Sequence, residues 1–138
     1  MPFLLEPLVA GALGEGTQLD ASTHPPDVEA VEYVLDAPSA DDLIESFPVF
    51  LVSDWLAERL DRAGLDGFAL AGALVVPSRE YVEVYGPAPH KSYRWLRLLT
   101  STTADCWLDE EYRLCVSDRM MAVLREGVLE GCDITPLS

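Results

Sequence analysis

The residues best suited to chemistry in this sequence are two serine-aspartate pairs that belong to a repeated segment. Ser53-Asp54 and Ser117-Asp118 each follow a short apolar run, and segments 52–70 and 116–134 align without a gap. A serine nucleophile needs a base such as histidine or lysine to take its proton. Neither segment contains one. We therefore expect both serines to cap helices and both aspartates to lie in the first helical turn.

Two histidines are the other candidates for a general base or a metal ligand. His24 precedes two prolines, and His90 lies in a proline-rich turn. They lack the HxH or HxxxH spacing that directs two imidazoles at one ion. We expect both to be loop histidines, with no catalytic residue, no metal and no cofactor in the chain.

The three cysteines, Cys106, Cys115 and Cys132, are an odd number and contain no CxxC pair. This pattern favours buried free thiols over a disulfide framework or a zinc knuckle, and it is typical of a reducing compartment. The apolar run at the N-terminus lacks the basic residues of a signal peptide, and no apolar stretch is long enough to span a bilayer. We expect a cytoplasmic protein that does not bind membranes.

Net charge is the most informative bulk property. The 138 residues include 24 acidic and nine basic side chains, for a net charge of −15. Such a field repels nucleic acid and anionic lipid and attracts basic proteins. A small basic aromatic patch, residues 90–97, could be a nucleic-acid stacking platform, but we expect its cations to pair within the chain. Solubility alone would also explain the acidity.

Two acidic clusters are candidates for the surface that would meet a basic protein. One lies in segment 38–48, where Ser39 is a plausible cap and the acidic residues would begin a helix. The other is an acidic run beside Trp107. Helix stabilisation and a solvated turn are the structural explanations of the two clusters. The predicted partner-binding residues are Asp41, Asp42, Glu45, Asp109, Glu110 and Glu111.

Periodicity indicates the elements that would position these residues. Segments 28–36, 49–52, 68–76 and 93–99 read as strands, segment 107–116 ends in a strand at Leu114–Val116, and 78–85 fits a strand or a helix. Gly64 and Gly127 are expected to end the two repeat helices in the left-handed conformation. We predict a single α+β domain over residues 1–138. A mixed sheet of about five to seven strands would carry two similar strand-helix-strand units, at about 49–76 and 112–137.

Several segments together resemble a set of small uncharacterised bacterial proteins. They are LGEGTQLD, HPPDVEAVEYVLD, SADDLIESFPVFLVSDWLAERLDRAGLDGF, SYRWLRLL and RLCVSDRMMAVLREGVLEGCDITPL. The two VSD…L…L units are also similar to a family classed among immunity proteins of polymorphic toxin systems. The paired cysteine knuckles of the related double-CxxCG proteins are absent from this sequence. The resemblance implies a protein that binds a cognate toxin domain and blocks it by occlusion, without catalytic residues.

Three functional hypotheses follow. The first is a non-enzymatic acidic protein-binding module that neutralises a toxin. The second is a small enzyme or an accessory subunit of a biosynthetic pathway, with a pocket near the two Ser-Asp helix starts. The third is a self-assembling structural protein. A pocket that joins a histidine to a carboxylate would favour the second hypothesis.

Overall fold

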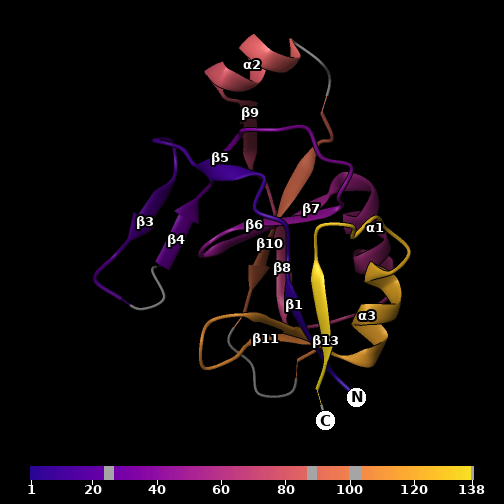
Figure 1. The fold of residues 1–138 in the computed structure, drawn as a ribbon. Helices are drawn as coiled ribbons and strands as arrows, with labels where there is room; N and C mark the ends of the chain where they lie inside the picture. Colours follow the sequence, from indigo (N-terminus) through magenta and orange to yellow (C-terminus); the bar gives the residue numbers. More distant parts are fainter. Residues whose placement is uncertain (24–26, 87–89, 100–103, 138) are drawn as a thin grey trace.

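Two four-stranded antiparallel sheets with the same strand pattern form the centre of the molecule (Figure 1). The computed structural model describes residues 1–23, 27–86, 90–99 and 104–137. The β10 sheet has the order β6 (Leu43–Ser46), β7 (Val49–Ser53), β10 (Tyr93–Leu98), β8 (Phe68–Ala71). The β1 sheet has the order β11 (Cys106–Leu108), β12 (Leu114–Val116), β1 (Phe3–Glu6), β13 (Asp133–Pro136).

One helix follows the second strand of each sheet. Helix α1 (Asp54–Arg62) follows β7, and helix α3 (Asp118–Leu124) follows β12. The hydroxyl of Ser53 accepts the Leu56 N–H at 3.2 Å, and that of Ser117 accepts the Met120 N–H at 3.2 Å. Both serines are therefore N-caps, which confirms the prediction from the repeated segment.

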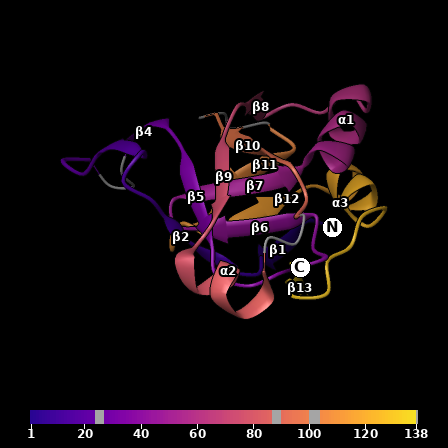
Figure 2. The same ribbon diagram turned by 90° about the horizontal axis from the view of Figure 1, so that it is seen from above.

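The repeat is a unit of hairpin, helix and strand that closes around a strand from elsewhere in the chain. In the first half, β6, β7, α1 and β8 surround β10, which follows them in the sequence. In the second half, β11, β12, α3 and β13 surround β1, which precedes them by about a hundred residues. Figure 2 shows α1 and α3 side by side, and α2 (Arg79–Tyr85) well away from both. The α+β fold class with two similar units is confirmed.

The remaining strands form two smaller sheets. Strands β2 (Gly11–Leu13), β5 (Glu32–Leu35) and β9 (Leu74–Pro77) form a mixed sheet in which β9 is parallel to β5. Strands β3 (Gln18–Asp20) and β4 (Asp27–Ala30) form a ribbon that projects from the body (Figure 1). Val31 separates β4 from β5, so segment 28–36 serves two sheets. The strands are thus distributed over four small sheets instead of one.

The helix predicted in segment 38–48 is wrong. The Ser39 hydroxyl does accept the Asp41 N–H at 3.0 Å, but the chain then enters strand β6. Serine makes the same short-range bond in turns as at helix starts, so the capping signal does not distinguish the two. Pairing decides the outcome, because Ile44 lies opposite Leu51 in a hairpin and both side chains are buried.

Two other sequence features are resolved by the structure. Segment 78–85 is a helix, α2, and its cap Ser78 accepts the Tyr81 N–H at 3.0 Å. Gly64 has a φ of 67°, as expected for the residue after α1. Gly127 is not among the described residues with positive φ, so the left-handed end predicted for α3 is wrong. Glycine is needed at position 127 because of close packing: a Cβ there would lie 2.8 Å from a carboxylate oxygen of Asp42.

The apolar core is divided between the two faces of the β10 sheet. On one face Val52 packs with Leu56 of α1 and Met120 of α3. On the other face Leu51 packs with Tyr33 of the mixed sheet and other aromatic residues. Strand β7 is buried on both faces, which explains its continuous apolar sequence. No helix in the described ranges is long and apolar enough to cross a membrane.

Candidate functional site

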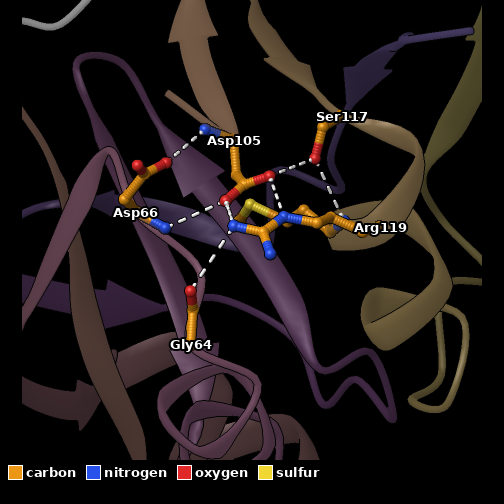
Figure 3. Close-up of polar contacts among 6 residues, drawn as sticks. Gly64, Asp66, Asp105, Ser117 and Arg119 are labelled. Carbon is orange, nitrogen blue, oxygen red and sulfur yellow. Dashed lines mark hydrogen bonds and ion pairs between the residues drawn. The ribbon is translucent and has the colours of Figure 1, made fainter. Parts of the chain in front are cut away.

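Asp105, directly before β11, is the centre of a buried polar cluster between the two halves (Figure 3). Arg119 of α3 donates to it from Nε at 2.8 Å and from Nη2 at 2.7 Å. The Ser117 hydroxyl donates at 2.7 Å, and the Asp66 N–H donates at 3.0 Å from the loop after α1. Arg119 first, and then these other donors, lower the pKa of Asp105 far below its usual range against the effect of burial.

Asp42, directly before β6, makes a second buried cluster. Its Oδ1 accepts the Lys91 ammonium at 2.7 Å, and its Oδ2 accepts the Val128 N–H at 2.6 Å. The Ser53 hydroxyl also bonds to this carboxylate. Burial opposes ionisation of Asp42, but these three donors outweigh it and lower its pKa. Asp41 is buried beside it and accepts the Gly131 N–H at 2.7 Å. Both carboxylates are engaged inside the chain.

The predicted acidic run is the turn between β11 and β12. Asp109 organises this turn, because its Oδ1 accepts the N–H groups of Glu111 and Arg113 and its Oδ2 accepts Nε of Arg113, all at 2.9 Å. Burial opposes ionisation of Asp109, but these bonds outweigh it and lower the pKa. Glu110 and Glu111 are exposed. Of the six predicted partner-binding residues, these two are the exposed ones, and Glu111 also pairs with Arg113 at 3.6 Å.

Glu45, the sixth predicted residue, lies in β6 and is half-buried. Burial, with a smaller effect of the Glu6 carboxylate, raises its pKa to about 7. A carboxyl of this kind would suit a general acid, but none of the described histidine or lysine side chains hydrogen-bonds to it. It does not join Asp41 and Asp42 in their cluster.

Two cavities lie near the predicted residues. One, of about 470 Å³, opens at the start of α1 and is lined by Asp42, Ser53, Asp54, Trp55, Lys91, Ser92, Glu126 and Val128. The other, of about 490 Å³, lies along β10 and β11, with Trp95, Arg97, Trp107 and Asp109 among its lining residues. Both fall in the size range of ligand sites.

The α1 cavity lies at one of the two Ser-Asp helix starts, where the second functional hypothesis placed a pocket, but sequence reasoning did not single out Trp55 as one of its walls. Trp55 occupies the position that Arg119 occupies in the second copy. In the second half Arg119 closes over Asp105, whereas in the first half Trp55 is 46% exposed and lines an open cavity. Position 55/119 is one of the 13 among 19 aligned positions at which the two segments differ.

The basic aromatic patch is directed into the fold. Lys91 pairs with Asp42 at 2.7 Å and Arg94 with Asp54 at 3.5 Å, as expected for cations that pair within the chain. Tyr93 and Trp95, which a stacking platform would present, are each 6% exposed. His90 is half-buried, with Nδ1 2.8 Å from the carbonyl oxygen of its neighbour. His24 lies outside the described residues.

The three cysteines are free and buried. Burial raises the pKa of Cys106 and of Cys132 to about 12, so both are neutral thiols. Over the described ranges, no group of three or more His, Cys, Asp or Glu side chains is arranged to hold a metal ion.

All nine lysine and arginine side chains are engaged within the chain. Six pair with carboxylates, and Arg59, Arg97 and Arg125 lie over aromatic rings. Twelve of the 24 acidic residues lie in residues 1–58, which contain no lysine or arginine. Four exposed members of this group, Glu15, Asp20, Asp27 and Glu29, lie on or beside the projecting β3–β4 ribbon, and three others, Glu6, Asp36 and Glu58, are exposed elsewhere. The ribbon is therefore one of the acidic parts of the surface.

Comparison with known proteins adds no family: neither the protein-family models nor the curated proteins that were searched match this chain.

Proposed function

We propose that this protein is a non-enzymatic binding module whose acidic surface receives a basic protein. The supporting observation is that its cations are all engaged internally, while most of its carboxylates form no salt bridge among the described residues. Among the described residues, eight carboxylates form salt bridges, out of 24 in the chain. The chain thus has more carboxylates than cations to neutralise them, and a field of this sign speeds association with a positively charged surface.

The partner that we propose is a toxin domain, which the protein would neutralise by covering its active surface. This part of the proposal comes from the resemblance of the two VSD units to an immunity family. The engagement of both Ser-Asp pairs as helix starts agrees with a protein that works by occlusion. Glu110 and Glu111, with the acidic β3–β4 ribbon, are the surface that we expect to meet the toxin.

The test is co-expression with the protein encoded by the adjacent upstream gene, followed by kinetics of the purified pair. We expect growth rescue and a stable complex. Association should slow steeply between low and high salt, with a much smaller change in dissociation. Absence of a complex, or association indifferent to salt, would overturn the proposal.

A matched pair of charge reversals locates the surface. Glu110→Lys in the acidic turn should slow association with the toxin domain at low salt. Glu80→Lys on α2 makes the same change of net charge on an exposed residue at the opposite end of the molecule (Figure 1). Equal effects of the two variants would show that net charge alone acts and would remove the acidic turn from the interface.

The second candidate function is a small enzyme or an accessory subunit, and the cavity at the start of α1 favours it. This cavity lies at one of the two Ser-Asp helix starts. No described histidine lines it, the Lys91 ammonium is bound to Asp42, and the Ser53 hydroxyl is engaged as a cap. Because none of the described histidine or lysine side chains is placed to activate the Ser53 hydroxyl, we rank this function second.

A further inference from the structure

The cavity at the start of α1 can be compared with the matching helix start in the second half of the molecule. In the second half, the side chain at position 119 is an arginine whose guanidinium makes two bonds to Asp105. In the first half, the aligned position is Trp55, and the space beside the equivalent aspartate, Asp42, is a cavity of about 470 Å³. At the second Ser-Asp helix start the molecule thus shows a guanidinium on Asp105, and at the first it shows the Lys91 ammonium on Asp42 beside an opening lined by Trp55.

The charges around the cavity leave one carboxylate available. Lys91 neutralises Asp42, and Arg94 neutralises Asp54 from outside the cavity. Glu126, in the loop after α3, is exposed and makes no salt bridge among the described residues. A single added cation would therefore pair with Glu126, close to the Arg59 guanidinium, which lies on the Trp55 ring, does not line the cavity and makes no salt bridge among the described residues.

The aromatic wall suits a guanidinium in particular. The Trp55 ring is 46% exposed, and the Arg59 guanidinium already lies 3.7 Å from its centroid. A planar guanidinium can stack on the indole and bond a carboxylate at once, which an ammonium cannot do as well. Exposed tryptophan beside a pocket is also typical of residues that dominate binding energy in protein interfaces.

We infer that this cavity receives an arginine side chain of the protein partner, which would stack on Trp55 and pair with Glu126. This inference rests on the proposed function, because it names the contact by which a basic partner is anchored. It also gives the electrostatic attraction between the acidic surface and a basic partner one specific point of contact. The second cavity is a weaker candidate because Arg97 lines it and makes no salt bridge among the described residues.

The test uses a hexa-arginine peptide as the probe and the intact protein. The chain has three tryptophans, so three indole N–H signals report on binding in a nuclear magnetic resonance titration, once each is assigned with a Trp→Phe variant. We expect the Trp55 signal to move first, while those of Trp95 and Trp107 stay in place. A hexa-lysine peptide should produce a smaller shift at Trp55. If the peptide saturates its binding to the protein while the Trp55 indole signal does not move, the inference is overturned.

A matched pair of neutralising variants isolates the cavity from general electrostatics. Glu126→Gln and Glu130→Gln each remove one exposed carboxylate from the loop after α3, but only the first lines the cavity. We expect Glu126→Gln to weaken binding of the peptide about five- to tenfold and Glu130→Gln to have a small effect. If both variants weaken peptide binding equally, the peptide responds to the net charge of the protein and not to the cavity.

The outcomes separate this inference from the proposed function. If the upstream toxin domain binds with unchanged affinity to Glu126→Gln and to Trp55→Leu, the cavity is not the anchor, although the protein is still a binding module. If both variants weaken the complex and Glu130→Gln does not, the anchor is confirmed. Binding of free arginine amide with an affinity equal to that of the peptide would indicate a small-molecule site and would overturn the anchoring of a protein.

Discussion

Asp42 and Asp105 hold equivalent places in the two halves, and each carboxylate binds the loop that follows the helix of the other half. Asp42 precedes the hairpin of the first unit and accepts the N–H of Val128, which follows α3. Asp105 precedes the hairpin of the second unit and accepts the N–H of Asp66, which follows α1. The two units are therefore joined by a reciprocal pair of buried charged hydrogen bonds as well as by their apolar core.

The equivalence extends to the helix starts. The Ser53 N–H donates to the Asp42 carbonyl at 2.8 Å, and the Ser117 N–H donates to the Asp105 carbonyl at 2.7 Å. Each carboxylate also bonds the hydroxyl of its own cap serine and one cation. In each half, one buried aspartate accepts the cap serine, the cation and the N–H of the opposite loop. Neutralising that aspartate is therefore expected to loosen a helix start and a loop together.

Neutralising either aspartate should destabilise the fold. We expect Asp42→Asn and Asp105→Asn each to lower the free energy of unfolding by about 2–4 kcal/mol, because a cation and several hydrogen-bond donors lose the buried carboxylate that accepts them. Urea denaturation measures the change. Asp133→Asn, an exposed aspartate in β13, is the control and should have almost no effect. A cost equal to that of the control would contradict the structural role.

Glu45 should make stability fall as pH rises through a defined window. Its pKa is about 7 in the fold, against about 4.5 for the unfolded chain, so the folded state holds the proton more tightly. The sign follows: stability is lost between about pH 4.5 and 7 and is constant above. Glu45→Gln should flatten this slope and gain about 1–3 kcal/mol at pH 8. Unfolding curves of both proteins at pH 5 and 8 measure it. If the free energies of unfolding of the two proteins differ by the same amount at pH 5 and pH 8, the pH dependence does not come from Glu45 and its neighbour Glu6.

The two cap serines should contribute equally to stability. Ser53→Ala and Ser117→Ala each remove the acceptor of the first-turn N–H and a bond to the buried aspartate, at an expected cost of about 1–2 kcal/mol. Thermal unfolding followed by circular dichroism checks this. Ser92→Ala is the control, since Ser92 is exposed and precedes β10 outside any cap. Melting temperatures unchanged from the parent would show that the hydroxyls do not act as caps.

Gly127 and Gly64 should respond differently to the same substitution. A Cβ at Gly127 would lie 2.8 Å from Oδ2 of Asp42, which is fixed by its own bonds, whereas a Cβ at Gly64 meets nothing within 4 Å. Gly64→Ala should cost about 1 kcal/mol through its positive φ. Gly127→Ala should cost more, and this excess should shrink in an Asp42→Ala background. A double-mutant cycle measures the coupling, and strict additivity would argue against the contact.

Much of the fold could be predicted from short-range patterns in the sequence. The caps at Ser53 and Ser117, the strand at Val49–Val52 and the repeated unit all follow from residues within one or two turns of each other. A cap bond joins residues three apart, and the alternation of a strand has a period of two, so neither needs knowledge of distant partners. The α+β class follows from the same local signals.

The errors and omissions have long-range causes. Ser39 signals a helix locally, but pairing of β6 with β7 overrides the signal. Asp41 and Asp42 look like surface charges in sequence. They are buried because Val128 and Gly131, about 90 residues away, donate to them. The strand that completes each half, β10 or β1, cannot be chosen from the repeat itself, since neither belongs to it.

The sequence by itself therefore determined the building unit, its helix starts and the excess of negative charge, because these depend on neighbours along the chain and on composition. Only the tertiary structure decided which carboxylates remain on the surface and where the cavity beside Trp55 opens. The physical reason is that burial and charge pairing depend on which distant residues arrive at a carboxylate. The local sequence does not determine whether a lysine, an arginine or solvent will lie beside a given carboxylate in the folded protein.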